Sequence, residues 1–233
     1  MLFESIFFRD NRQFVSKACD GLFKDHRHLE SLFCYLSGGR KVHTRVQKLL
    51  GGHIENLELY LSSMNDTLEY AEKLEKIKED CVIEFGGSKV HKYIHILRMA
   101  GDHFDGDGSA LFRLQTDDGP KSAAPHILAI KVGKNYHFEL WVERERVLEN
   151  LELEQSISAF LHLAFCFHLK YPKSAETVAD FLQRVVADYG DDSGTRTSKN
   201  KDTAASKLLR YHIQLGKVLG EKKASFESIE EDP

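Results

Sequence analysis

Paired cysteines are missing from this sequence. Its four cysteines, Cys19, Cys34, Cys81 and Cys166, are widely spaced along the 233 residues, and none belongs to a C-x-x-C motif. Small secreted scaffolds held together by disulfides carry cysteines at closer, paired spacings. We therefore expect a reducing intracellular environment, in the cytoplasm or the nucleus.

Long apolar runs are also missing. The most apolar segment, residues 157–169, contains two histidines and is followed by Lys170, whereas a helix needs about 20 apolar residues to span a bilayer. Residues 1–9 are apolar but show neither a basic leader nor a small-residue cleavage site. We expect them to contact the core rather than to act as a signal peptide. The sequence predicts no membrane span.

Neither sign of charge dominates the chain. Lysine and arginine number 32 against 36 aspartates and glutamates, which gives a formal net charge of −4. Such a balance provides no global attraction to nucleic acid or to an anionic membrane. A local basic stretch formed by Arg40, Lys41, Arg45 and Lys48 keeps nucleic-acid association as an alternative function.

Catalytic motifs are absent as well. The sequence has no G-x-S-x-G nucleophile elbow, and the glycines before Arg40-Lys41 and before Lys89 lack the full spacing of a P-loop. Acidic pairs such as Asp117-Asp118 fall in predicted loops, where side chains are not held in place for acid–base chemistry. We expect no enzymatic activity and no cofactor, and a metal-dependent enzyme remains the second alternative.

Twelve histidines raise the question of a metal site. His91 and His95 stand one helical turn apart, a spacing that can chelate zinc, with Cys81 ten residues upstream. A zinc finger would need a second nearby cysteine, and a zinc protease would need glutamate where Lys92 stands. The Asp- and Gly-rich residues 102–108 lack the terminal glutamate of a calcium loop. We expect a solvated turn there and no metal, with His91 and His95 as the remaining candidates.

Residues 1–100 carry the patterns of a helical region. Apolar side chains recur at helical spacing in several stretches: Phe14, Val15, Ala18 and Leu22; Leu29, Leu32, Phe33 and Leu36; Val42, Val46, Leu49 and Leu50; Ile54, Leu57, Leu61, Met64, Leu68 and Ala71; Val90, Ile94 and Leu97. Glycine pairs at 38–39 and 51–52 are predicted to end the second and third helices. A capping-box pattern at residues 66–69 favours two helices in the fourth stretch.

The pattern changes in the middle of the chain. Residues 101–125 are rich in Gly, Asp and Pro and predict a connection, with a possible short strand at residues 110–114. From His126 the apolar period becomes two, which indicates strands at 127–132 and 136–143, joined by a loop at 133–135. A third strand at 146–149, after a turn at 144–145, would complete an antiparallel meander.

Residues 150–190 predict a helical hairpin that covers the meander. Asn150 is placed to cap the first helix and Ser174 the second, and Pro172 separates them. Residues 156–183, SISAFLHLAFCFHLKYPKSAETVADFLQ, resemble a segment of uncharacterised animal proteins. Some of these are loosely labelled as sterile-alpha-motif-containing-like, and some occur near mobile elements. The resemblance covers residues 126–190 and implies an architecture without carrying over a function.

The last segment predicts a basic amphipathic helix. Residues 191–203 lack apolar anchors and predict a disordered linker, and the helix after them ends in an acidic tail. Such a helix can dock on a partner or pack on its own domain, and the sequence leaves both open. We expect it to contact a protein partner through the following side chains: Lys207, Arg210, Tyr211, Leu215, Lys217 and Val218.

These patterns predict a predominantly helical α+β protein. Its regions are a helical N-terminal half (1–100), a connection (101–125), a small β-meander on an α-helical hairpin (126–190), a linker (191–203) and a peripheral helix with an acidic tail (204–233). We expect a non-enzymatic intracellular interaction or assembly module. The alternative is a nucleic-acid-associated protein of mobile-element ancestry. The sequence leaves the identity of the partner and the oligomeric state open.

Overall fold

The computed structural model describes residues 25–64, 68–117, 123–169, 171–189 and 204–230. The helices and strands in chain order are α3 (His26–Leu36), α4 (Val42–Ser63), α5 (Leu68–Ile83), α6 (Lys89–Asp105), β1 (Phe112–Leu114), β2 (His126–Val132), β3 (Asn135–Val142), β4 (Glu145–Leu151), α7 (Leu153–Cys166), η1 (Lys173–Ala175), α8 (Glu176–Asp180), η2 (Phe181–Val186) and α9 (Ala204–Glu230). The predicted α+β class with a predominance of helix is confirmed. The expected helix around residues 14–22 and the expected linker at 191–203 lie outside the described residues.

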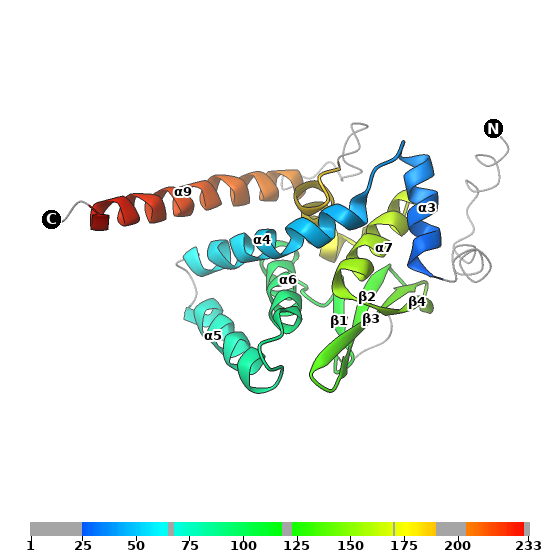
Figure 1. Cartoon of the computed structure of the whole chain (residues 1–233), viewed down its shortest axis with the longest axis horizontal. Helices are drawn as coiled ribbons and strands as arrows, with labels where there is room; N and C mark the ends of the chain where they lie inside the picture. The colour runs from blue at the N-terminus through cyan, green and yellow to red at the C-terminus, as the bar shows by residue number, and fades with distance from the viewer. Residues whose placement is uncertain (1–24, 65–67, 118–122, 170, 190–203, 231–233) are drawn as a thin grey trace.

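A four-stranded sheet lies at one end of the molecule, and helices occupy the rest (Figure 1). The strand order is β1-β2-β3-β4, with antiparallel pairing from β2 to β4 and a parallel pair between β1 and β2. The predicted meander is therefore confirmed, and residues 112–114 add a strand to it. Helices α6 and α7 both pack against β3, whose Phe138, Leu140 and Val142 are buried as the period of two predicted.

Both turns of the meander differ from the predicted ones by one residue. Gly133 and Lys134 form the first turn, because Asn135 already pairs with Val132. The second turn consists of Glu143 and Arg144, which both adopt positive φ values. Positive φ at both central residues is the geometry of tight hairpin turns whose twist matches that of the strands. Neither residue type favours it, so the sequence carries no local signal for this turn.

Helix α4 contradicts the prediction that the glycine pair at 51–52 ends a helix. It runs without a break from Val42 to Ser63, while α5 is a separate helix, as the capping-box pattern favoured. Gly51 serves close packing instead, since a Cβ atom there would lie 2.9 Å from the Tyr93 hydroxyl oxygen of α6. Tertiary packing outweighs the cost of about 1 kcal/mol for each glycine inside a helix.

The caps of the next two helices also differ from the prediction. Glu152 rather than Asn150 caps α7, in a capping box with Gln155, while Asn150 belongs to β4. Ser174 lies in the 3-10 turn η1, and α8 begins after it at Glu176. Helix α8 then continues as the π-helical turn η2, in which the Ala187 N–H donates to the Leu182 carbonyl over 2.8 Å.

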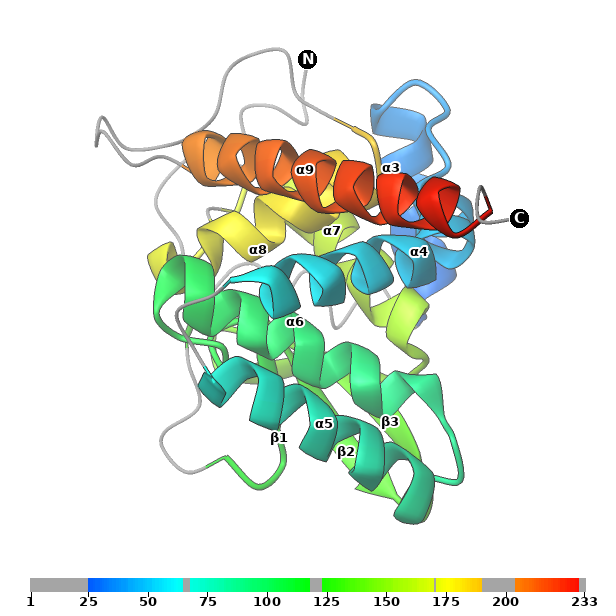
Figure 2. The same ribbon diagram turned by 90° about the vertical axis from the view of Figure 1, so that its left-hand side faces the viewer.

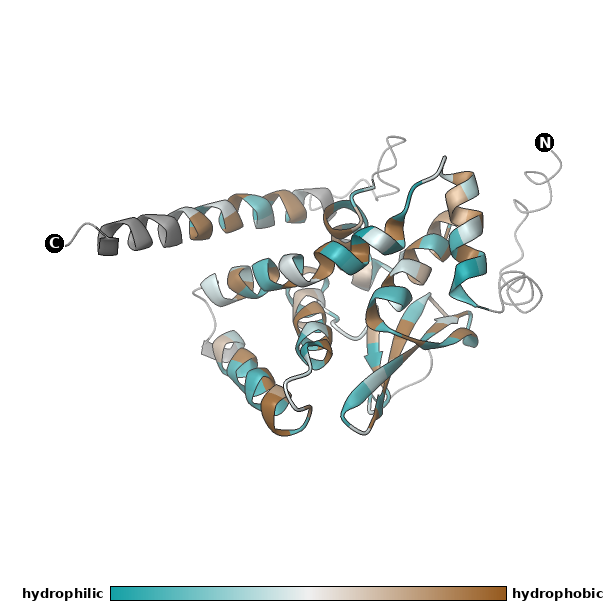
Figure 3. Cartoon of the chain, viewed as in Figure 1, coloured by the Kyte–Doolittle hydropathy of each residue, from teal (hydrophilic) through white to brown (hydrophobic). Residues whose placement is uncertain are grey.

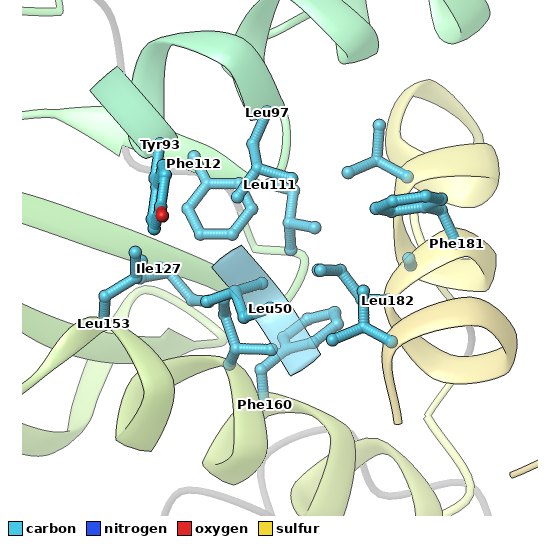
Figure 4. Close-up of a cluster of buried hydrophobic side chains, with 14 of the residues drawn as sticks. Leu50, Tyr93, Leu97, Leu111, Phe112, Ile127, Leu153, Phe160, Phe181 and Leu182 are labelled. Atoms are coloured by element: carbon cyan, nitrogen blue, oxygen red, sulfur yellow. The ribbon is translucent and has the colours of Figure 1, made fainter. Parts of the chain in front are cut away.

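One continuous buried cluster joins the helices to the sheet. Figure 4 shows its centre, where side chains from α4, α6, β1, β2, α7, η2 and the residue before β1 meet. The labelled residues are Leu50, Tyr93, Leu97, Leu111, Phe112, Ile127, Leu153, Phe160, Phe181 and Leu182. Most of α7 is buried in this cluster, including Phe160 and Leu161, which agrees with its nearly uniform apolar sequence.

Candidate interaction surface around helix α9

Helix α9 lies on the outside of the molecule and packs on α4 and α8 (Figures 1 and 2). Tyr211 anchors it, with 1% of its surface exposed. The ring centroid of Tyr211 lies 5.0 Å from that of Tyr60, 5.7 Å from Phe181 and 6.5 Å from Phe104. Burial raises the pKa of Tyr211 to about 12. We call Tyr60, Phe104 and Phe181 the aromatic seat of α9.

A buried carboxylate fixes the position of α9 along this seat. Asp105, at the end of α6, accepts hydrogen bonds from the Thr177 amide at 2.9 Å and the Thr177 hydroxyl at 2.6 Å. It also pairs with the Lys207 ammonium at 3.2 Å, and Lys207 donates to the Phe104 carbonyl as well. Asp105 thus caps α8 and holds α9 at the same time. The observed position of α9 is against its own chain.

The six side chains predicted to contact a partner divide into two groups. Tyr211 and Leu215 are buried and Lys207 is paired with Asp105, so these three hold α9 on its own chain. Val218 is half-buried, whereas Arg210 and Lys217 are exposed. Only the exposed residues face outwards while α9 occupies its seat.

Helix α9 also carries a second apolar face, which the sequence patterns above did not predict. Leu209 and Ile213 are 60% and 54% exposed, and Gly216 and Gly220 continue the same line along the helix. No heavy atom lies within 4 Å of a Cβ built at either glycine. We call these four residues the outer stripe. Figure 3 shows the hydrophobic segments of α9 in brown. The outer stripe's spacing of four, three and four was readable in the sequence, but the opposite face, with Leu208, Tyr211 and Leu215, gives the stronger apolar pattern.

A groove of about 480 Å³ adjoins the inner edge of α9. It is lined by Tyr60, Met64, His103, Phe104, Lys207, Arg210, Ile213 and Gln214. The Tyr60 hydroxyl oxygen and the His103 Nε2 atom are 3.1 Å apart. Burial lowers the pKa of His103, and the nearby Lys207 charge lowers it further. The groove therefore combines an aromatic floor with two cationic side chains at its rim.

The basic stretch that the alternative function requires lies at the start of α4. Arg40, Lys41, Arg45 and Lys48 are all exposed. The last three follow one another at helical spacing and share the outward face, opposite the buried Val42, Val46 and Leu50. Arg45 also pairs with Asp188.

The two histidines that were metal candidates lie against each other, with ring centroids 4.4 Å apart. His91 Nδ1 is 3.1 Å from the Tyr136 hydroxyl, and Cys81 donates to the Ser88 carbonyl instead of joining them. Burial lowers the pKa of His91, and it lowers the pKa of His95 to about 4. Within the described ranges, no three metal-ligating side chains gather at one point.

The aspartates at and just after the end of α6 bind protein groups. Asp102 accepts from the Gly108 amide at 2.7 Å, and Asp107 accepts from the amide and the hydroxyl of Ser109. Their oxygens shape the turn at residues 106–109, and Asp105 caps α8. The turn expected at residues 102–108 is thus only partly found, because α6 continues to Asp105 and the Asp105 side chain is buried.

The described residues form an α+β protein with an external C-terminal helix. In that part of the chain, no helix is both long and apolar enough to cross a membrane. Comparisons with protein-family models, with curated proteins and with solved structures give no match to this chain.

Proposed function

We propose that this protein is a non-enzymatic interaction or assembly module and that α9 is its contact element. The observation that carries the proposal is the outer stripe, because Leu209 and Ile213 remain exposed while Tyr211 is buried on the opposite side. A helix that packs through one face needs only that face to be apolar. Exposed apolar side chains grouped on a folded protein are typical of association sites.

The seat of α9 favours binding through the outer stripe. Tyr211 and the Lys207–Asp105 pair hold the first half of the helix in place. The exposed face is therefore ordered before a partner arrives, which reduces the entropy lost on binding. Arg210 and Lys217 are exposed and add positive charge beside the stripe.

The test replaces the outer stripe without disturbing the seat. A variant with Leu209→Glu and Ile213→Glu should lose the proteins that the wild type captures from a cell extract. Leu209 is 60% exposed, and Ile213, at the rim of the groove, is 54% exposed. Circular dichroism and the melting temperature should therefore stay close to those of the wild type. Deleting α9 would be a poorer test, because it would also expose the aromatic seat.

Val82 and Ile83 provide the matched control. They are 70% and 77% exposed at the end of α5, away from α9, and Val82→Glu with Ile83→Glu introduces the same change of charge. This control should capture the same proteins as the wild type. Equal capture by all three proteins would refute the role of α9.

Nucleic-acid association is the second candidate, favoured by the shared outward face of Lys41, Arg45 and Lys48. It predicts binding that weakens steeply with salt. A variant with Lys41→Glu and Lys48→Glu should weaken binding of a labelled oligonucleotide and reduce the slope of log K against log salt by about 1 for each phosphate that is no longer neutralised. An absence of binding by the wild type at low ionic strength would rule this candidate out.

A further inference from the structure

Along the outer stripe, large side chains precede glycines, an arrangement that binding to an unrelated protein would not require. Residues 209, 213, 216 and 220 fall within a sector of about 60° of the helix, since each residue turns the chain by 100°. The two large side chains come first and the two glycines follow. Leu209 and Ile213 project outwards, while Gly216 and Gly220 leave open space at the same face.

We propose that α9 pairs in antiparallel orientation with α9 of a second copy of this chain. The twofold axis crosses the pair at the level midway between residues 214 and 215. This inference rests on the proposed function and names its partner. The axis brings Leu209 opposite Gly220 of the second copy, and Ile213 opposite Gly216 of the second copy. Twofold symmetry then repeats both contacts with the roles exchanged.

The fit of large side chains against glycines supports the antiparallel direction. A large side chain meets a glycine at each of the four contacts, so the two helix backbones can approach closely without leaving a cavity. A parallel pair would instead place Leu209 against Leu209 and Gly220 against Gly220. The large side chains would then hold the helices apart where the glycines leave a void.

The position of α9 leaves room for the second copy. The helix forms an outer layer of the molecule, and its C-terminal end extends past the ends of α4 and α5 (Figures 1 and 2). The outer stripe lies roughly 150° around the helix from the buried face. Pairing therefore leaves the contacts of Tyr211 with the aromatic seat in place.

The length of the stripe sets the strength of the pair. Eleven residues separate Leu209 from Gly220, which is about 16 Å of helix, so the contact is smaller than the roughly 1,600 Å² of a stable interface. We expect a reversible dimer with a dissociation constant on the order of 10–100 μM. Arg210 and Lys217 lie on one flank, where Arg210 of each copy approaches Lys217 of the other copy, so added salt should strengthen the pair.

Sedimentation velocity over about 5 to 500 μM measures the association. The mass of the full chain should rise from 26.6 kDa towards twice that value. Ile213→Asp should remain monomeric throughout, or weaken the pair at least tenfold, whereas Val82→Asp should behave as the wild type. Circular dichroism of both variants confirms that they are folded.

Cysteine cross-linking tests the direction of the pair. A double variant with Leu209→Cys and Gly220→Cys should form a disulfide-linked dimer on oxidation, because each new thiol faces the other one across the axis. The two positions are too far apart to close within one helix. Leu209→Cys alone should not cross-link beyond the wild-type background, since its two copies would be about 16 Å apart along the axis.

The outcomes separate this inference from the proposed function. A wild type that stays monomeric, a dimer that Ile213→Asp leaves intact, or a dimer cross-linked by Leu209→Cys alone would each overturn the antiparallel pair. If the wild type is monomeric but the outer-stripe variant still loses captured proteins, the proposed function stands without self-association. A dimer that behaves as expected supports the inference even if no other protein is captured.

Discussion

Asp105 is the residue on which the contacts between α6, α8 and α9 converge. Its buried carboxylate accepts from the Thr177 amide and hydroxyl and from Lys207. Asp105→Asn removes the charge and leaves Lys207 without its anion, so the free energy of unfolding should fall by about 3–5 kcal/mol. Urea denaturation followed by circular dichroism measures the loss.

Asp107→Asn is the control for that loss. The Asp107 carboxylate accepts from the amide and the hydroxyl of Ser109 in the same turn. An asparagine oxygen can replace these contacts, so the change should stay within about 1 kcal/mol. Equal effects of the two substitutions would show that Asp105 holds the helices no more strongly than Asp107 holds its turn.

Two histidines make stability depend on pH. Burial lowers the pKa of His162 to about 3, with nearby His43 and His26 adding to the effect, and burial lowers the pKa of His95 to about 4. In the unfolded chain their pKa values return to about 6.5. Below pH 6.5 the unfolded state therefore binds more protons than the folded state, and stability is lost as the pH falls towards these folded-state pKa values.

The slope of stability against pH identifies the contribution of His162. Between pH 6 and pH 5, each of the two histidines should cost up to about 1.4 kcal/mol for each pH unit. His162→Phe should remove one such contribution and can keep the stacking on Phe33, whose ring centroid is 4.4 Å away. Urea denaturation at pH 8, 6 and 5 measures both slopes, and identical slopes would contradict the assignment.

Among the elements, α4 shows a matched pair of glycines with different roles. Nothing lies within 4 Å of a Cβ at Gly52, whereas a Cβ at Gly51 would meet the Tyr93 hydroxyl at 2.9 Å. Gly52→Ala should stabilise the protein by about 0.5–1 kcal/mol through helix propensity. Gly51→Ala should be less stable than Gly52→Ala, because the hydroxyl must move.

Removing the Tyr93 hydroxyl should make Gly51→Ala about as stabilising as Gly52→Ala. In the background of Tyr93→Phe, Gly51→Ala should gain nearly the full helix propensity, and a double-mutant cycle of melting temperatures reports the coupling. A coupling of zero would mean that the Tyr93 side chain gives way freely.

The elements also show how far the sequence could predict the fold. The apolar positions Val46, Leu50, Ile54 and Leu57 keep their helical phase across the glycine pair, so the unbroken α4 was readable in the sequence. The start of α8 was not, because its cap, Asp105, lies 72 residues before Thr177. A local pattern can place Ser174 before a helix, but it carries no information about a carboxylate that arrives from another helix.

The candidate surface was predictable to a similar extent. The inner face of α9 follows from the spacing of Leu208, Tyr211 and Leu215, and all three are buried. Whether that face packs on its own chain depends on where Tyr60, Phe104 and Phe181 come together. These residues belong to three separate helical elements, so only the folded structure shows that they form one seat.

At the scale of the whole molecule, the continuous core should make the described parts unfold together. The buried cluster runs from Leu29 in α3 to Leu215 in α9 and includes the sheet, and the parallel β1–β2 pair fastens the segment after α6 to the meander. We expect one calorimetric transition, with the van't Hoff enthalpy equal to the calorimetric enthalpy. Two resolved transitions would show that the helical half and the meander are separate domains.

During synthesis of the chain, the aromatic seat is made before the helix that covers it. Phe181, the last residue of the seat to be translated, precedes Tyr211 by 30 residues. At about 5–20 residues per second, a ribosome needs roughly 2–6 seconds to make that stretch. During this interval the nascent chain has an aromatic hollow and no helix to fill it. Chaperones that bind apolar side chains would bind the exposed seat, and they would lose this binding site once α9 emerged and covered it.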